Sequence, residues 1–182
     1  MALTKLNNQS LSAVTVAGIP IRSGSVLQVK QELSNTKSIK SSLTFVDTGL
    51  FTGMTFDNNL QANSKVFAII EATIGEQNST AWAQPCELTL YEGSSNIGND
   101  ANSGIVGSIA IVSGNSGNDT YGMERVYGSI LYTPSSTNPS YKLYLRTTGV
   151  TAFNRTVGGS YNTGHADYIV GGTRITLMEI AA

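Results

Sequence analysis

The sequence predicts an all-β protein, an antiparallel β-sandwich or jelly roll with an extended N-terminal arm. Only 13% of the residues are charged and 40% are hydrophobic, which disfavours long exposed helices and also disfavours disorder. Nineteen glycines, with many Ser, Thr and Asn residues, favour tight turns. Short apolar segments recur between those turns and alternate with period two, as strands do. We therefore expect an arm at 1–24 and one sandwich domain at 25–182.

The strand segments follow one another along the whole domain. Alternation opens at Val26, continues with Leu43 and Phe45 around Thr44, and resumes after the Gly49 turn. Turn-rich sequences such as 134–139 separate the later segments. Strands are expected at 26–29, 39–46, 50–56, 65–72, 87–91, 105–112, 127–132, 141–146 and 173–180.

Two of these segments, 65–72 and 173–180, are apolar on both faces. In the first, Val66 points to one side and Ile69 to the other; in the second, Leu177 and Met178 do the same. One sandwich covers only one face of a strand, so the other face needs a second layer or a second subunit. The pattern leaves open which face takes the core. We therefore expect the subunit interface to draw on Val66, Ile69, Leu177 and Met178.

The N-terminal arm contains aliphatic residues among small polar ones and no aromatic residue. Pro20 fixes its own φ and keeps Ile19 out of the helical region. A frayed terminus would have the same composition, and the alternative is a segment that docks on another protein or another copy. We expect docking through Leu3, Leu6, Leu11, Ile19 and Pro20.

Charge and composition exclude several classes of protein. The formal net charge is −1 and no Lys/Arg cluster is present, so nucleic-acid binding is not expected. No apolar run is long enough to cross a membrane, and the N-terminus lacks the apolar core of a secretory signal. The single cysteine, Cys86, cannot form a disulfide within the chain and is expected to be a buried small hydrophobe.

Three ordered segments resemble a family of bacteriophage virion proteins common in marine phages, including those that infect cyanobacteria. The residues 1–11 with Ile19-Pro20 are similar to the family's attachment arm. The segments 24–29, 44–50 and 64–66 are similar to its first strands, and 172–181 to its closing strand. The resemblance spans nearly the whole chain. It implies a β-rich, trimeric fibre of the tail or head, or a capsid decoration, assembled in the host cytoplasm and exposed on the virion with other virion proteins as partners.

No group of residues in the sequence indicates a reaction, a metal or a cofactor. His165, the only histidine, lies in a polar loop, where a solvated side chain is the commoner role than catalysis. One His and one Cys cannot make an ordinary zinc site. Asp100 and Asp119 lie in Gly-Asn-Asp loops and are expected to form turns rather than a Ca²⁺ site. We therefore expect no enzyme activity, no metal and no cofactor.

Any exposed recognition is expected on the loops 93–104, 114–123 and 158–168. These loops carry Tyr121, Tyr161 and Tyr168, and aromatic loop residues stack on sugars or anchor protein contacts. A host surface glycan or protein is the expected partner. Two other functions stay open, a soluble carbohydrate-binding sandwich module and a depolymerase-like enzyme; a trimer would favour the virion protein over the module, and activity on polysaccharides would favour the enzyme.

Overall fold

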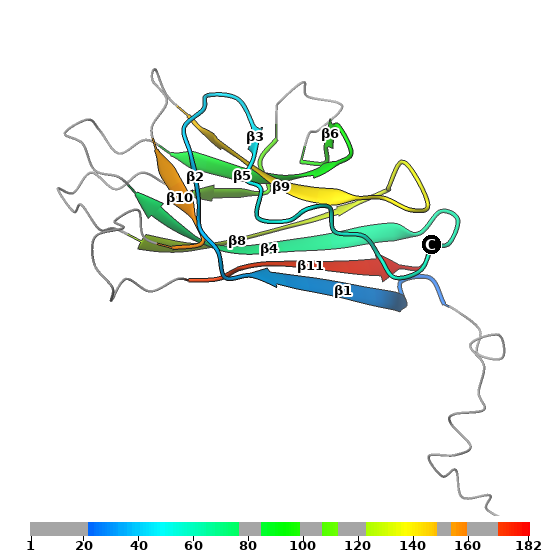
Figure 1. The fold of residues 1–182 in the computed structure, drawn as a ribbon. Helices are drawn as coiled ribbons and strands as arrows, with labels where there is room; N and C mark the ends of the chain where they lie inside the picture. Colours follow the sequence, from blue (N-terminus) through cyan, green and yellow to red (C-terminus); the bar gives the residue numbers. More distant parts are fainter. Residues whose placement is uncertain (1–21, 77–84, 99–106, 113–122, 149–153, 160–170) are drawn as a thin grey trace, which may run out of the picture.

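The computed structural model describes residues 22–76, 85–98, 107–112, 123–148, 154–159 and 171–182. These residues form two antiparallel sheets that lie one over the other (Figure 1), which confirms the all-β antiparallel sandwich. The jelly-roll connectivity stays a prediction. The described part of the chain contains no helix that could cross a membrane.

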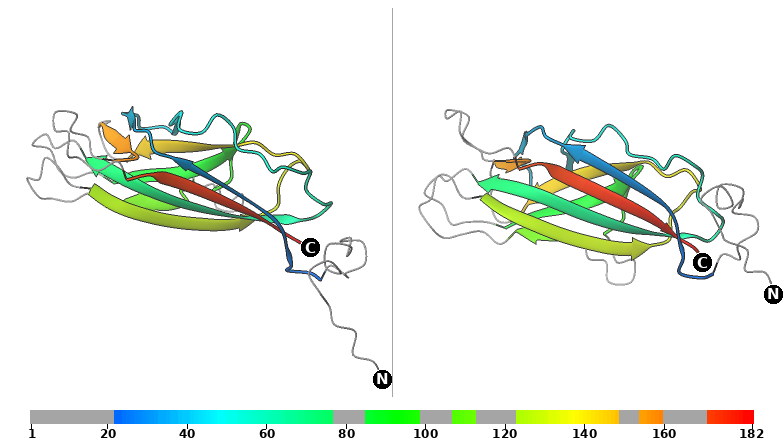
Figure 2. Two further views of the ribbon diagram at one scale, coloured as in Figure 1. Left: turned by 60° about the horizontal axis from the view of Figure 1, so that its bottom comes forward. Right: turned by 90° about the horizontal axis from the view of Figure 1, so that it is seen from below.

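The larger sheet has six strands. Four of them, β1 (Val26–Ser34), β11 (Thr173–Ile180), β4 (Lys65–Glu76) and β8 (Met123–Tyr132), lie side by side in that order, as the view from below shows (Figure 2). Beyond the residues of β4 that pair with β11, the C-terminal end of β4 pairs with β10 (Arg155–Val157). In turn, β10 pairs with β2 (Ser38–Lys40). The first and last strands of the domain are therefore neighbours in the sheet.

The smaller sheet has five strands. Its order is β3 (Val46–Asp47), β9 (Tyr141–Thr147), β5 (Cys86–Glu92) and β6 (Ser95–Asn96), and β7 (Ala110–Val112) also pairs with β5. The backbone at Ile109, next to β7, lies close against Gly128 of β8, and the two sheets approach each other there. A Cβ atom at Gly128 would lie 2.1 Å from the Ile109 carbonyl oxygen, so no larger residue fits without a backbone shift.

One hydrophobic core fills the space between the sheets. Period-2 alternation directs every second side chain of β4, β5, β9 and β11 into it. Cys86 is part of this core, as the sequence predicts. Side chains with no exposed surface include Val66, Ala68, Ile70, Leu88, Leu90, Leu143, Leu145, Ile175 and Leu177.

Two of the predicted strands differ in the structure. The segment 39–46 is not one strand, because β2 belongs to the larger sheet and β3 to the smaller, and the chain crosses between them. A local turn makes this crossing, in which the Ser42 hydroxyl bonds the Thr44 carbonyl (2.7 Å) and accepts from the Thr44 amide (3.1 Å). The segment 50–56 has no strand and contributes one bridge, from Met54 to Tyr141.

Candidate subunit interface on the larger sheet

The outer face of the larger sheet, turned away from the core, carries an apolar row that crosses four strands. Register aligns Val29 of β1 with Met178 of β11, Met178 with Phe67 of β4, and Phe67 with Leu131 of β8. Val29 is 55% exposed and Leu131 51% exposed, while the two central residues are half-buried. We call these four residues the apolar row.

The apolar row continues on both sides along the strands. Toward the chain termini lie Val26, 53% exposed, and its partner Ile180. On the other side, Ile69 is half-buried opposite Thr176. Large contiguous apolar patches on a folded domain are typical of surfaces that contact another molecule.

The far part of the outer face is charged. The Glu71 carboxylate lies 3.2 Å from a guanidinium nitrogen of Arg174 and 3.5 Å from one of Arg125. The Arg125 guanidinium carbon is also 5.7 Å from the ring centre of Tyr127, which is 61% exposed. These partly exposed pairs contribute little to stability. They lie next to the exposed side chains of Leu33 and Tyr127, so this part of the outer face mixes charged and apolar groups.

The structure corrects two of the four residues that the sequence suggests for the interface. Val66 and Leu177 have no exposed surface, because alternation turns them into the core. Ile69 and Met178 lie on the outer face and remain candidates. Phe67, Val29 and Leu131 are not among the predicted interface residues, because only the pairing of strands shows that they form one row with Met178.

The other candidate residues lie outside the described part of the chain. This holds for the expected docking residues of the arm, for the tyrosines of the expected recognition loops, and for the loop residues considered for catalysis or for Ca²⁺ binding. They are Leu3, Leu6, Leu11, Ile19, Pro20, Asp100, Asp119, Tyr121, Tyr161, His165 and Tyr168. Among the described residues, no group of three His, Cys, Asp or Glu side chains is placed to hold a metal ion.

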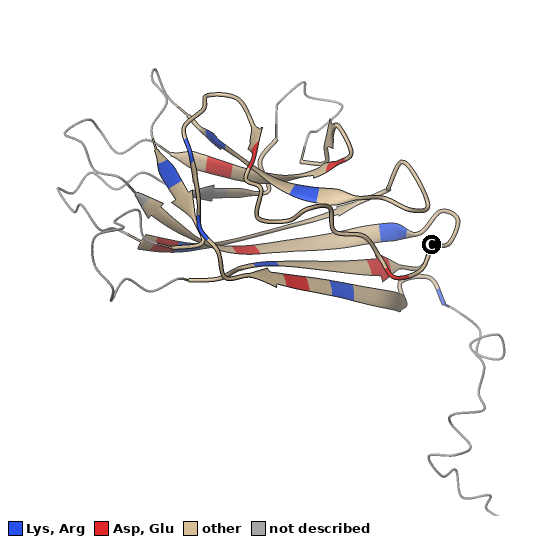
Figure 3. Cartoon of the chain, in the orientation of Figure 1, with Lys and Arg blue, Asp and Glu red and all other residues tan. Residues whose placement is uncertain are grey.

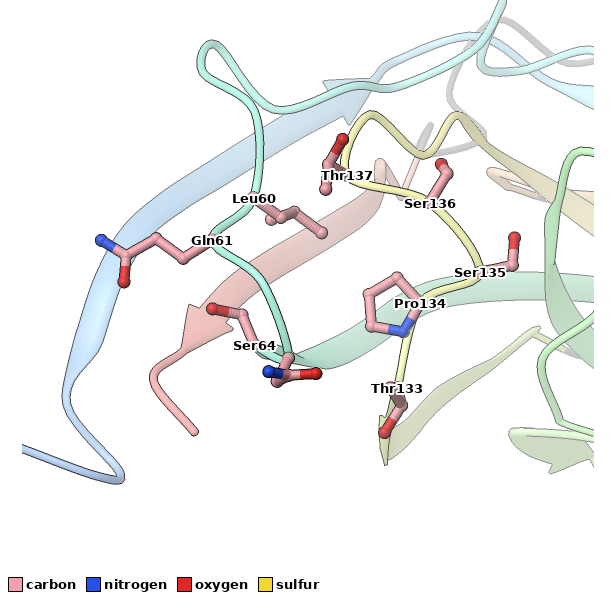
Figure 4. Close-up of a pocket in the computed structure, with 9 residues that line it drawn as sticks. Leu60, Gln61, Ser64, Thr133, Pro134, Ser135, Ser136 and Thr137 are labelled. Atoms are coloured by element: carbon pink, nitrogen blue, oxygen red, sulfur yellow. The ribbon is translucent and has the colours of Figure 1, made fainter.

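A small pocket of about 190 Å³ opens between two loops at the end of the sandwich where the C-terminus lies (Figure 4). A hydrogen bond from the Leu60 amide to the Thr137 carbonyl (2.7 Å) joins the loops. The lining has no charged side chain, and the pocket is smaller than the roughly 300 Å³ at which ordinary ligand sites begin. It is lined by Leu60, Gln61, Asn63, Ser64, Thr133, Pro134, Ser135, Ser136 and Thr137.

Two buried carboxylates hold the walls of this pocket. Glu179 accepts hydrogen bonds from the Gln61 amide (2.6 Å) and from the Gln28 side chain (2.7 Å). Glu92 accepts from the amide (2.9 Å) and the hydroxyl (2.7 Å) of Ser135. Hydrogen bonds from several donors satisfy each carboxylate, as burial of such a group requires. These hydrogen bonds therefore attach the loop at Gln61 to β11 and the loop at Ser135 to β5.

The half-buried Tyr132 and the fully buried Tyr141 form a hydrogen-bonded pair beside Glu92. Their hydroxyl oxygens are 2.5 Å apart. Burial raises the pKa of Tyr132 far above its ordinary value of 10.0, and the neighbouring Tyr141 and Glu92 raise it further. Burial also raises the pKa of Tyr141, although the hydrogen bond from Tyr132 opposes that shift.

These raised pKa values predict a loss of stability in alkaline solution. Above pH 10 the tyrosines of the unfolded chain release their protons while the folded pair keeps them, so the free energy of unfolding falls as pH rises. We expect Tyr132→Phe to show a smaller fall than the wild type between about pH 8 and pH 11, measured by urea unfolding. An equal fall in both proteins would contradict the effect. Tyr127→Phe, at an exposed position, is the matched control and should behave as the wild type.

Comparison with known proteins does not assign the chain to a family. No protein-family model and no curated protein sequence matches the chain. A solved structure with some similarity comes from a crystal structure described as "the T13 IBDV viral particle". It aligns at 12% identity and a TM-score of 0.34, covering 87% of this chain and 37% of that one. The chain thus spans little more than a third of the protein it matches. A likeness at this level does not indicate a function.

Proposed function

We propose that the chain is a non-enzymatic structural protein of a bacteriophage particle, exposed on the virion surface as a homotrimeric fibre or capsid decoration. The observation that carries this proposal is the apolar row. Four aligned apolar side chains on the outer face are unsuited to a monomer in water, since burying each would stabilise an assembly by about 25 cal/mol per Å² of apolar surface. The resemblance of the sequence to phage virion proteins supports the same function.

In this proposal the outer face of the larger sheet, the arm and the loops have separate tasks. The outer face of the larger sheet joins the copies, and the arm attaches the assembly to other virion proteins of the capsid or tail. Contacts with a host glycan or protein use the loops that carry Tyr121, Tyr161 and Tyr168, where three copies multiply a weak affinity.

Removal of residues 1–21, which make up most of the arm, tests the attachment to the particle. A protein lacking residues 1–21 keeps the hydrogen bond from the Gly24 amide to the Ala181 carbonyl (2.9 Å), which closes the start of the domain. We expect it to fold and to form the same oligomer, but to be absent from purified virions, whereas the full chain is present. Immunogold labelling of intact particles and gel analysis of their proteins measure both. Normal incorporation of the truncated protein would contradict the docking role, and absence of the full chain from virions would contradict the proposed function.

A soluble carbohydrate-binding module is the second candidate, and the pocket between the loops is the observation that favours it. Its uncharged hydroxyl and amide lining suits a neutral sugar, although its volume admits little more than one small ring. Isothermal titration with host polysaccharides and their monosaccharides distinguishes the two functions. Binding by a monomeric protein would favour the module, and a trimer that binds no sugar would favour the structural protein.

A further inference from the structure

Strand β1 forms an edge of the larger sheet. Among the described residues its only strand partner is β11. The loop at Asp57 and Asn58 contacts β1 through the side chains of Lys30 (2.7 Å) and Gln28 (3.1 Å), not as a paired strand. An edge strand presents a row of unpaired backbone N–H and C=O groups, which can pair with a strand of another chain. At nine residues, β1 is long enough for several such hydrogen bonds.

The side chains of β1 add a pattern to this edge. Val29 and Leu33 point outward and are 55% and 53% exposed. Between them lie Lys30 and Glu32, which pair with the inward-facing Leu177 and Ile175 of β11 and so lie on the inner side. Figure 3 shows these two charges as neighbouring blue and red bands on the strand.

This pattern is complementary to itself when two copies of β1 run antiparallel about a two-fold axis at Gln31. Lys30 of each copy then lies opposite Glu32 of the other, and Val29 lies opposite Leu33. Opposite charges and apolar pairs across strands each stabilise an antiparallel sheet. An axis at Lys30 or at Glu32 would instead place two like charges directly opposite each other, which is unfavourable.

We propose that β1 pairs with β1 of a second copy in this register and joins the larger sheets of two subunits into one continuous sheet. The contact has two-fold symmetry and uses the edge of the sheet, so it is separate from the contact on the outer face. Within the proposed function it links subunits of neighbouring trimers. Inward-facing charges can also protect an edge strand from pairing, and that role predicts the opposite results in the experiments below.

A cysteine at the two-fold axis tests the register directly. In the full chain, Gln31→Cys places two cysteines opposite each other, with Cα atoms about 4.5–5.5 Å apart, within the range of a disulfide. The only native cysteine, Cys86, is buried and does not compete. We expect a disulfide-linked dimer on mild oxidation. The matched control is Leu33→Cys, at an exposed position outside the apolar row, whose two cysteines would be four residues apart along the strands, roughly 13 Å, and should not link.

Each outcome of the cysteine experiment either supports or overturns the proposed pairing. A linked dimer with Gln31→Cys and none with Leu33→Cys supports the proposal. No linkage with Gln31→Cys overturns it, and equal linkage with both variants overturns the register, because random collision would explain it. The Met178→Asp exchange on the outer face should leave the Gln31→Cys linkage intact, so failure of the trimer and failure of the edge contact are distinguishable.

A charge exchange tests the complementarity. In the Gln31→Cys background, Lys30→Glu and Glu32→Lys should each lower the yield of linked dimer several-fold, because like charges then face each other. The double exchange restores opposite charges and should restore the yield. Lys30 also forms an ion pair with Asp57 (2.7 Å), but the single Lys30→Glu variant and the double exchange both lose that pair. A double exchange that links as poorly as the single variants would overturn the proposed pairing.

Discussion

Replacement of Leu177 with aspartate should leave the chain unfolded, whereas the same replacement at Met178 should give a folded protein that no longer forms the trimer. Leu177 has no exposed surface, and an unpaired charge in the core costs several kcal/mol, a large part of the 5–15 kcal/mol that stabilises a typical domain. Met178 lies on the outer face, where a carboxylate keeps contact with water in the monomer and disfavours only the assembly.

Circular dichroism and light scattering measure these two results together. The pair is informative because the residues are adjacent, so differences in local sequence cannot explain opposite outcomes. Phe67→Asp, in the same apolar row, should repeat the result of Met178→Asp. A soluble trimer from either outer-face variant would contradict the interface, and a folded Leu177→Asp protein would contradict the core.

The Tyr141→Ala replacement should cost about 3–5 kcal/mol of folding free energy. In the described part of the chain, Tyr141 is the largest side chain with no exposed surface. Its ring meets the rings of Phe56 and Tyr132 edge-on, with centres 6.5 and 6.3 Å away. Its backbone also exchanges two 2.8 Å hydrogen bonds with Met54, so the site cannot collapse easily around the cavity.

The Tyr141→Phe replacement is the control for this cavity. It keeps the ring and removes only the hydroxyl, so we expect a loss of about 0.5–1.5 kcal/mol from the hydrogen bond with Tyr132. Urea unfolding monitored by circular dichroism measures both variants. An alanine variant that loses no more than the phenylalanine variant would show that the Tyr141 ring does not fill the core as described.

The sequence predicts the long strands well because their alternation has one clear solution. Segments 87–91 and 141–146 lie within β5 and β9. Burial alternates along the whole of β9, and in β5 only Thr89 departs from the alternation, since it is also buried. The crossing between β2 and β3 could not be predicted, because 39–46 has the composition of a continuous strand. What ends that strand is the change of sheet, a property of the whole fold rather than of local sequence.

The candidate interface shows a different limit. Alternation separates Val66 from Phe67 and Leu177 from Met178, but both faces are apolar, so it cannot show which face is inside. In the structure the inner face is the one that carries Val66, Ala68 and Ala72, all without exposed surface. The apolar row itself joins residues about 150 positions apart, from Val29 to Met178. Only the register of the strands brings them together.

The native mass of the full chain in solution, measured by light scattering across a range of concentrations, tests the central claim most directly. The account predicts a stable particle of three times the 19.2 kDa of one chain, together with larger species where β1 edges pair. The Met178→Asp protein should fall below that mass under the same conditions. A wild-type protein that stays a 19.2 kDa monomer at every concentration, with the apolar row open to solvent, would contradict it.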